Sequence, residues 1–509
     1  MRFNTTSKAN DTVLNHEGAK AYRMSPEMEL YAAIATTMLS DATYEKADER
    51  MARIISLLPK VKAEFVARLA VYARKQMNLR TAPVVLATEL AKIHSGDSLV
   101  SRMVEHIVQR PDEIMELLAY YQLANKRTSA KKLNRISKQL QKGLAGSFNK
   151  FDEYQFAKYN RDAEVKLRDA LFLVHPKAKD ATQQVLFNKI AKQELATPYT
   201  WETELSALGQ QAFASPEEKA LAFTRKWEAL IDSGKLGYMA LLRNLRNILS
   251  ANVSAAHIGK ICRYLSDEKA VATSKQLPFR FLAAYRELKD IASDYTSLLM
   301  DTLETAITYS VQHLKGFDPD TKVVIACDVS GSMQKPVSAK SKVLLYDIGL
   351  LLGMLLQYKS QRVVSGMFGD TWKMVSLPRR GVLANVDAFY RREGEVGYAT
   401  NGYLVLDDLV QRKYIADKVM IFTDVQLWDS NTNNASAHNT LSSRWAAYKR
   451  IAPQAKLYLF DLSGYGNTPL RVEQNDVHLV AGWSDKVFDV MEAMEHGADA
   501  LDRIYAIEL

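Results

Sequence analysis

Cysteine is scarce in this 509-residue chain, since Cys262 and Cys327 are the only two. Two thiols in so long a chain exclude a disulfide framework and a metal site built from cysteines, and they favour a reducing compartment. No apolar run approaches the roughly 18 residues needed to span a bilayer. The N-terminus, MRFNTTSKAND, is polar, so we expect no secretory signal. These absences together predict a cytoplasmic protein with no membrane partner, long enough for two to four domains.

The C-terminal part of the chain lacks a net charge of either sign. Residues 321–509 carry 21 basic and 21 acidic side chains, whereas residues 1–320 carry 46 and 37. Within the first part, residues 126–192 alone hold 16 basic and 6 acidic residues, a balance of +10 that accounts for the whole net charge of +9. This concentration indicates a local anionic partner rather than a charge spread for solubility.

Residues 20 to about 315 show apolar residues at helical spacing, interrupted near prolines such as Pro111, Pro216 and Pro278. The pattern predicts one helix after another, without an exact sequence repeat. Helices of similar length in a long run favour stacked pairs, as in a HEAT-like solenoid, and the alternative is an irregular all-α domain.

The pattern changes near residue 318. Short buried-strand runs now alternate with helical segments, which predicts a mostly parallel, doubly wound α/β sheet that binds ligands at the carboxyl ends of its strands. The predicted strands are Val323–Ala326, Arg362–Met367, Lys418–Phe422, Lys456–Phe460 and Val477–Val480, and the predicted helices are 340–358, 383–391, 402–413, 440–451 and 485–495. The expected domains are an N-terminal segment at 1–19, a helical-repeat region at 20–317 and an α/β domain at 318–509.

Oxygen-bearing side chains follow two of these strands. Asp328, Ser330 and Ser332 leave the first strand on alternate residues, and Asp424 ends a later one at the same edge of the sheet. Thr400 lies on a glycine-flanked loop before a helix. Hard oxygen ligands of this kind suit Mg²⁺, or Mn²⁺. The set resembles the metal-ion-dependent adhesion site of von Willebrand factor A domains, although the loop reads Ala-Thr-Asn where Gly-Thr-Asp is common in that family.

That resemblance implies a role for each residue. Ser330 and Ser332 would bind the metal directly, Thr400 directly or through water, and Asp328 and Asp424 would hold metal-bound waters. The ion would keep an open position for the carboxylate of a protein ligand. One alternative is a set of ordinary caps and turns, because Ser and Asp often follow strands. Another is a hydrolytic pair of Asp328 and Asp424, but no general base, nucleophile or phosphate-binding glycine-rich lysine motif accompanies them, so we expect no catalytic residues.

A basic stripe begins the charged segment. Lys131, Arg135, Lys138 and Lys142 share one face of a predicted helix, and apolar residues occupy another. A helix that packs on one side and presents cations on the other suits a phosphate backbone. The alternatives are a solvated helix face and, less suited for lack of an exposed apolar face, a membrane surface.

Aromatic and basic residues interleave downstream, from Phe151 to Arg161, with Lys158 among them. Rings that stack on bases and cations that meet phosphates suit unpaired nucleotides. His175 precedes Pro176 at the end of an apolar run. Taken alone, such a histidine is typical of a structural residue at a helix end.

Several stretches resemble the Ro autoantigen, or TROVE-domain, family in order and spacing, over nearly the whole chain. They are LRDALFLVHPK at Leu167–Lys177, ALLRNLRN at Ala240–Asn247, LPFR at Leu277–Arg280, CDVSGSM at Cys327–Met333 and IFTD at Ile421–Asp424. The first two are the most specific, whereas the α/β pieces occur in many proteins.

The resemblance implies a bacterial or phage member with a monomeric ring of HEAT-like helices and a C-terminal von Willebrand A domain. It implies a non-enzymatic scaffold that binds small structured Y-type RNAs on a basic outer surface and single-stranded 3′ ends of misfolded RNAs in a central hole. An exoribonuclease is an implied partner in RNA processing and quality control. Lys158, Arg161 and His175 fall where the family contacts RNA, which makes His175 an RNA contact. The alternative function is a metal-dependent protein-assembly module.

Overall fold

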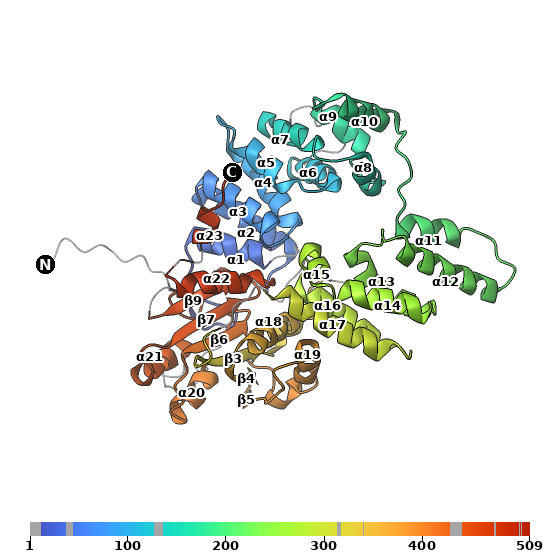
Figure 1. Cartoon of the computed structure of the whole chain (residues 1–509). Helices are drawn as coiled ribbons and strands as arrows, with labels where there is room; N and C mark the ends of the chain where they lie inside the picture. Colours follow the sequence, from blue (N-terminus) through green and yellow to red (C-terminus); the bar gives the residue numbers. More distant parts are fainter. Residues whose placement is uncertain are drawn as a thin grey trace. The chain divides into compact units, whose positions relative to one another are not determined.

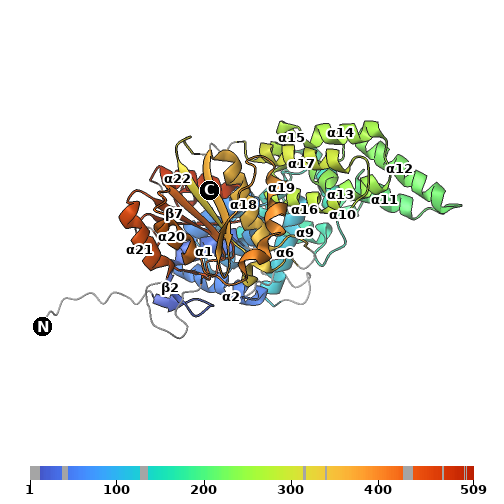
Figure 2. The same ribbon diagram turned by 90° about the horizontal axis from the view of Figure 1, so that it is seen from below.

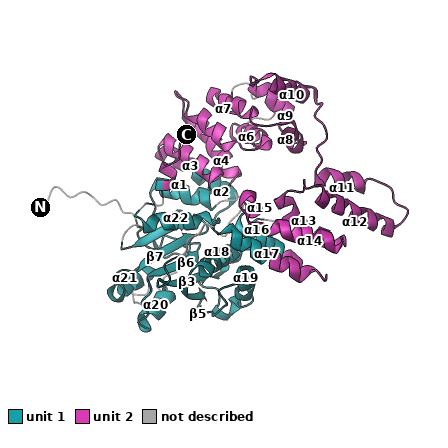
Figure 3. Cartoon of the chain, in the orientation of Figure 1, with its two compact units in different colours: residues 1–54, 276–285, 303–502 teal, residues 55–275, 286–302, 503–509 magenta. Residues whose placement is uncertain are grey.

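The computed structural model describes residues 12–36, 44–126, 136–312, 317–338, 341–427, 440–472, 475–497, 499 and 501–509. The chain divides into two compact units, shown in different colours in Figure 3. Unit 1 contains residues 1–54, 276–285 and 303–502, and unit 2 contains residues 55–275, 286–302 and 503–509. No helix in the described part of the chain is long and apolar enough to cross a membrane.

Unit 2 is helical, as the spacing of its apolar residues predicts. Its helices are α3 (Ala63–Lys75), α4 (Thr81–Ile93), α5 (Leu99–Ile107), α6 (Pro111–Ala124), α7 (Lys138–Phe148), α8 (Glu153–Tyr159), α9 (Leu167–Val174), α10 (Ala181–Lys192), α11 (Trp201–Gly209), α12 (Pro216–Asp232), α13 (Tyr238–Ser250), α14 (Ala255–Leu265) and α15 (Glu268–Ser274). One boundary between the units lies between α15 and α16, and the others fall within α2 (Ala47–Leu57), α16 (Pro278–Lys289), α17 (Thr296–Ser310) and α23 (Asp502–Tyr505). A short 3-10 helix, η1 (Leu58–Lys60), follows α2.

The helix starts follow from local sequence. Pro111 and Pro216 occupy the first position of α6 and α12, where a missing backbone N–H has no cost. Asp152 caps α8, since its carboxylate accepts the Gln155 N–H at 2.7 Å. Alternate helices contact each other, α3 with α5, α5 with α7, and α4 with α6, as stacked helical pairs do.

Unit 1 is built on a six-stranded sheet (Figures 1 and 2), whose strands lie in the order β5-β4-β3-β6-β7-β9. All neighbours are parallel except the edge pair β4 and β5. The strands are β3 (Lys322–Asp328), β4 (Arg362–Phe368), β5 (Trp372–Met374), β6 (Lys418–Thr423), β7 (Lys456–Asp461) and β9 (Val477–Ala481). The predicted doubly wound α/β sheet is confirmed in its strands and their parallel order, and the short antiparallel β5 was not predicted.

Helices alternate with these strands along the chain. They are η3 (Gly331–Gln334), α18 (Leu345–Lys359), α19 (Val382–Tyr390), η4 (Glu393–Val396), α20 (Tyr403–Gln411), α21 (Leu441–Ile451) and α22 (Lys486–Glu495). The predicted helix at 340–358 begins only at Leu345, because Pro336 and Leu344 pair as an isolated bridge before it. Two glycines of α18, Gly349 and Gly353, let this helix lie close on β3 and β6.

The prediction of helices from residue 20 onward is wrong at its start. β1 (Thr12–Leu14) and β2 (Lys20–Arg23) form an antiparallel hairpin, and β2 pairs with β8 (Asn467–Thr468). The partner strand lies far along the sequence, so local patterns gave no sign of it. α1 (Pro26–Ala35) then packs on β9, where the Tyr31 hydroxyl donates to the Ala481 carbonyl at 3.1 Å. The predicted domain limits remain a prediction, and the packing units divide the chain differently.

Candidate functional site

Three aspartates end neighbouring parallel strands of unit 1. Asp328 is the last residue of β3, Asp461 is the last residue of β7, and Asp424 directly follows β6 between them. The strand order reverses between β3 and β6, which is where such sheets bind ligands. All three carboxylates are buried, so their charges meet little water.

The loop after β3 gathers two hydroxyls beside the first aspartate. Asp328 accepts the backbone N–H of Ser330 at 2.9 Å with one oxygen and the hydroxyl of Thr423 at 2.6 Å with the other. The hydroxyl oxygens of Ser330 and Ser332 lie 3.3 Å apart, and both side chains are buried. Two hydroxyls and a carboxylate thus converge as the spacing of the motif predicts.

The loop that carries Thr400 is held against the loop after β3. The Gly331 N–H donates to the Tyr398 carbonyl at 3.0 Å, which joins this loop to the loop after β3. On its other side the loop meets the end of β4, where a Cβ added to Gly369 would lie 2.2 Å from the Gly397 carbonyl oxygen. Only glycine permits that approach, which brings the buried Thr400 to the crevice.

The site has more negative charge than its hydrogen bonds satisfy. Burial raises the pKa of Asp328 and of Asp424, and the charge of Asp328 raises the pKa of Asp424 further. Asp424 Oδ1 accepts the Gln426 N–H at 3.0 Å, and the Ser332 hydroxyl interacts with the same carboxylate, but Asp424 Oδ2 has no hydrogen-bond partner among the residues that the structure describes. Burial also raises the pKa of Asp461 to about 6, and its Oδ2 likewise lacks a partner. A cation would compensate these charges.

The donor set fits a hard divalent cation. Asp328, Ser330, Ser332 and Asp424 come together directly, and Thr400 is brought to them by its loop. Every donor is oxygen, the kind that Mg²⁺ and Mn²⁺ take. Among the described residues no group of three or more His, Cys, Asp or Glu side chains could hold a metal, so hydroxyl oxygens are essential here. The metal itself stays a prediction.

The sequence analysis missed three residues at this site. Asp461 could have been found, since it follows a predicted strand in the same way as Asp424. Glu17 and Tyr44 gave no such signal, because they come from the N-terminal part of the chain. The Tyr44 hydroxyl donates to the Glu17 carboxylate and also hydrogen-bonds with Ser332. Both residues therefore belong to the edge of the crevice.

The basic stripe is only partly described. Lys131 and Arg135 lie outside the described residues. Lys138 and Lys142 are exposed on the first two turns of α7, whose Leu140 and Leu144 are buried. For this half of the stripe, the structure has cations on one face and core contacts on another.

Lys158, Arg161 and His175 are all exposed in unit 2. Lys158 lies on α8, Arg161 follows that helix, and His175 ends α9 in the left-handed conformation, with φ of 52°. α7, α8 and α9 all pack against α6. Gln141 of α7 donates to the Val174 carbonyl at 3.3 Å, so His175 is held beside the helix that carries Lys138 and Lys142.

An arginine stacks on a tyrosine next to Lys158. The Arg110 guanidinium lies 4.2 Å from the centre of the Tyr159 ring, and the Lys158 ammonium lies 5.8 Å from the rings of both Tyr154 and Tyr159. Rings and cations so placed attract each other. Tyr154 is exposed, which leaves a ring face of the kind that unpaired bases stack on.

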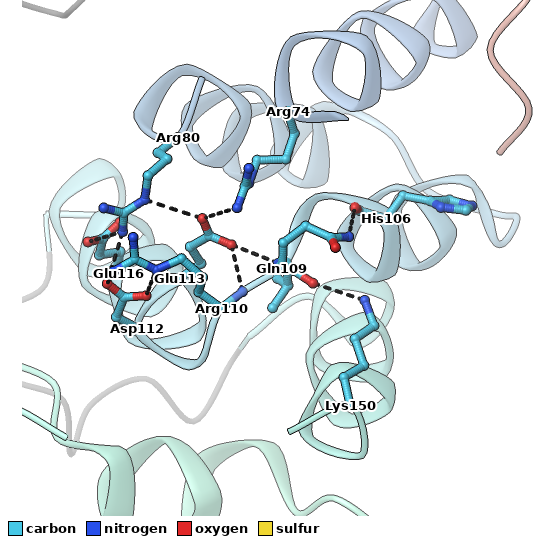
Figure 4. A network of polar contacts seen from close by, with 10 residues as sticks. Arg74, Arg80, His106, Gln109, Arg110, Asp112, Glu113, Glu116 and Lys150 are labelled. Atoms are coloured by element: carbon cyan, nitrogen blue, oxygen red, sulfur yellow. Dashed lines mark hydrogen bonds and ion pairs between the residues drawn. The ribbon is translucent and has the colours of Figure 1, made fainter. Parts of the chain in front are cut away.

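Buried ion pairs fix the position of Arg110 (Figure 4). Glu113 accepts the backbone N–H groups of Gln109 and Arg110 at 2.7 and 3.0 Å, and it pairs with Arg74 at 2.8 Å and Arg80 at 3.4 Å. Glu113 is almost completely buried. Its carboxylate therefore joins the start of α6 to α3 and to the loop before α4, which gives the Arg110–Tyr159 pair a rigid base.

Comparison with known proteins finds two curated relatives and a solved structure of similar fold. Telomerase protein component 1 of Rattus norvegicus is 25% identical over 353 residues, and that of Mus musculus is 24% identical. Each match covers 53% of this chain but only 13% of the relative. The crystal structure of the Deinococcus radiodurans Ro (Rsr) protein has a TM-score of 0.60 at 15% identity, and it covers 92% of this chain and 100% of that one. This likeness shows a shared fold.

The TROVE domain matches residues 20–194 and 191–312, which is more than half of the chain. The matched region contains Lys158, Arg161 and His175 as well as the Arg110–Tyr159 pair. It also contains the two stretches, at Leu167–Lys177 and Ala240–Asn247, that carried the specific part of the resemblance. The chain belongs to the TROVE domain family.

Proposed function

We propose that this protein is a non-enzymatic RNA-binding scaffold of the Ro type. The observation that carries the proposal is the exposed group of cations inside the TROVE region, Lys158, Arg161 and His175, of which Lys158 lies beside two tyrosine rings. Its RNA would be a small structured, Y-type RNA held through phosphates, together with single-stranded 3′ ends that stack on rings such as Tyr154. An exoribonuclease is the partner that such a scaffold would supply with RNA.

Binding of a small structured RNA, measured by fluorescence anisotropy at several salt concentrations, tests the proposal. Affinity should fall steeply with salt, because each phosphate contact releases counterions. Combined Lys158→Ala, Arg161→Ala and His175→Ala substitutions should weaken binding and lower the slope of log affinity against log salt by about 2. The matched control is the pair Lys219→Ala and Arg225→Ala, which removes two exposed cations of α12. Full affinity in the triple variant, or a flat salt response, would contradict the proposal.

A second function is proposed for unit 1, on the evidence of the unsatisfied carboxylate oxygen of Asp424. Ser330 and Ser332 would hold Mg²⁺ directly, Thr400 directly or through water, and Asp328 and Asp424 through water. The ion would attract the carboxylate of a partner protein, as in a von Willebrand A domain. Asp328→Ala and Ser330→Ala should then abolish divalent-metal binding in calorimetry and leave RNA affinity unchanged.

Absence of catalysis is part of the proposal and has its own test. RNA incubated with the protein and Mg²⁺ should stay intact on a denaturing gel. Cleavage that disappears in Asp424→Ala would replace the scaffold with a metal-dependent nuclease.

A further inference from the structure

The turn of the N-terminal hairpin is bound to the segment that follows Asp424. The Asn15 side chain donates to the Leu427 carbonyl at 2.8 Å, and the His16 N–H donates to the Gln426 side chain at 2.9 Å. These contacts join residues that are 412 and 410 positions apart in the sequence. The hairpin therefore covers one side of the metal crevice within unit 1.

The same turn has a fixed conformation that presents Glu17. The Asn15 carboxamide oxygen accepts the N–H groups of Glu17 at 3.1 Å and of Ala19 at 2.8 Å. Gly18, at φ of 76°, supplies the left-handed residue that the turn needs. The hydrogen bond from its N–H fixes the backbone at Glu17, and its side chain is only half-buried.

Tyr44 connects Glu17 to the proposed metal ligands. Its hydroxyl donates to Glu17 and hydrogen-bonds with Ser332, whose own hydroxyl interacts with Asp424. The Tyr44 ring stacks on His16, with 5.1 Å between ring centres and 3° between planes. One phenol oxygen thus separates the Glu17 carboxylate from a proposed ligand.

Charge makes this arrangement costly unless a cation is present. The Glu17 carboxylate and the buried Asp328 carboxylate repel each other. Asp328 and Asp424 are both buried and already repel each other, so a further carboxylate at this edge meets more repulsion. A cation bound at this edge would compensate these charges.

We propose that Glu17 is an internal ligand of the metal ion, and that its carboxylate takes the coordination position otherwise open to a partner protein. The proposal depends on the metal site proposed above. The hairpin then closes the site in the resting protein, and an external carboxylate binds only when the hairpin moves away.

Calorimetric titration of the full-length chain with Mn²⁺ provides the first test. Glu17→Gln keeps the side-chain size and an acceptor for the Tyr44 hydroxyl, but it should weaken Mn²⁺ binding by about tenfold or more. Glu27→Gln is the matched control, because Glu27 lies on α1 and has the same charge. Circular dichroism melting checks that each variant folds. Equal Mn²⁺ affinity in Glu17→Gln and wild type would overturn the proposal.

Acetate, added to the Mn²⁺-loaded proteins, provides the second test. Acetate should alter the Mn²⁺ electron paramagnetic resonance spectrum of Glu17→Gln, in which the coordination position of Glu17 is open. It should leave the spectrum of wild type unchanged. Tyr44→Phe should bind Mn²⁺ at least as tightly as wild type, since it frees Glu17 from its hydrogen bond. An equal acetate response in wild type and Glu17→Gln would overturn the internal-ligand role. Wild type that binds no Mn²⁺ would overturn the metal site as well, and RNA binding would be unaffected.

Discussion

The Thr423 hydroxyl donates to the Asp328 carboxylate at 2.6 Å and thereby joins the end of β6 to the end of β3. Thr423→Val keeps the shape of the side chain and leaves a buried carboxylate oxygen without its donor. We expect a loss of about 1–3 kcal/mol in the free energy of unfolding and about tenfold weaker Mn²⁺ binding, measured by urea denaturation and calorimetry. Thr302→Val is the control, since its buried hydroxyl only bonds within α17. Unchanged Mn²⁺ affinity would remove Thr423 from the support of the site.

Asp461 should make unfolding stability depend on pH. Its pKa is raised from 3.8 to about 6 in the folded protein, so the folded state binds the proton more tightly than the unfolded state. The free energy of unfolding should therefore fall as the pH rises from about 4 to 6. Asp461→Asn keeps an acceptor for the Ser463 and Gly464 N–H groups. Without divalent metal, it should gain up to about 3 kcal/mol over wild type at pH 7 and nothing below pH 4. A constant difference between the two proteins across this range would contradict the prediction.

Glu113 should be far more important for the stability of unit 2 than its exposed neighbour on α6. Glu113→Gln leaves Arg74, whose side chain is 11% exposed, without its charge partner, so we expect a loss of about 3 kcal/mol on urea denaturation. Glu116→Gln, at a side chain that is 48% exposed, should cost less than about 1 kcal/mol. Similar losses in the two variants would show that the network is not cooperative.

Gly369 should tolerate no side chain. A Cβ there meets the Gly397 carbonyl oxygen at 2.2 Å, so the Thr400 loop must move. Gly369→Ala is expected to cost about 2 kcal/mol of stability and to weaken Mn²⁺ binding. Gly331→Ala, in the same site, has 4.0 Å of space to the nearest atom and should be close to wild type in both respects. Normal Mn²⁺ binding by Gly369→Ala would place Thr400 outside the ligand set.

Lys138 and Lys142 should each contribute a phosphate contact. Alanine at both positions is expected to lower the slope of log RNA affinity against log salt by about 2. Lys189→Ala serves as the control, because Lys189 lies in the same basic segment but pairs with Glu153 at 2.7 Å. An effect of Lys189→Ala as large as that of the double variant would favour general attraction over a specific surface.

The sheet and much of the crevice could be predicted because their signals are local. Buried apolar runs mark β3, β6 and β7, and parallel strands necessarily bring Asp328 and Asp424 to one edge. Hydroxyls on alternate residues, Ser330 and Ser332, then complete the pattern. The helices of unit 2 could be predicted in the same way, from the helical spacing of their apolar residues.

What sequence could not supply is pairing between distant segments. The hairpin has only seven residues of strand, and its two-residue partner strand, Asn467–Thr468, lies more than 440 residues later in the sequence. Contacts of Asn15 and His16 with Leu427 and Gln426 bring Glu17 to the site, and no periodicity marks Glu17 or Tyr44. The Arg110–Tyr159 stack depends on the packing of α8 against α6, which spacing within one helix does not determine.

Pairing between distant segments also sets an order of assembly during protein synthesis. The hydrogen-bond partner of Tyr31, Ala481, is 450 residues later in the sequence. The ribosome needs about 20–90 s to synthesise the residues between them. Residues 55–275 can pack with one another during that time. In the nascent chain β2 therefore lacks its partner β8, and α1 lacks its partner β9, until the end of unit 1 has left the ribosome. Translation speed late in the message should thus influence how much of unit 1 is completed correctly.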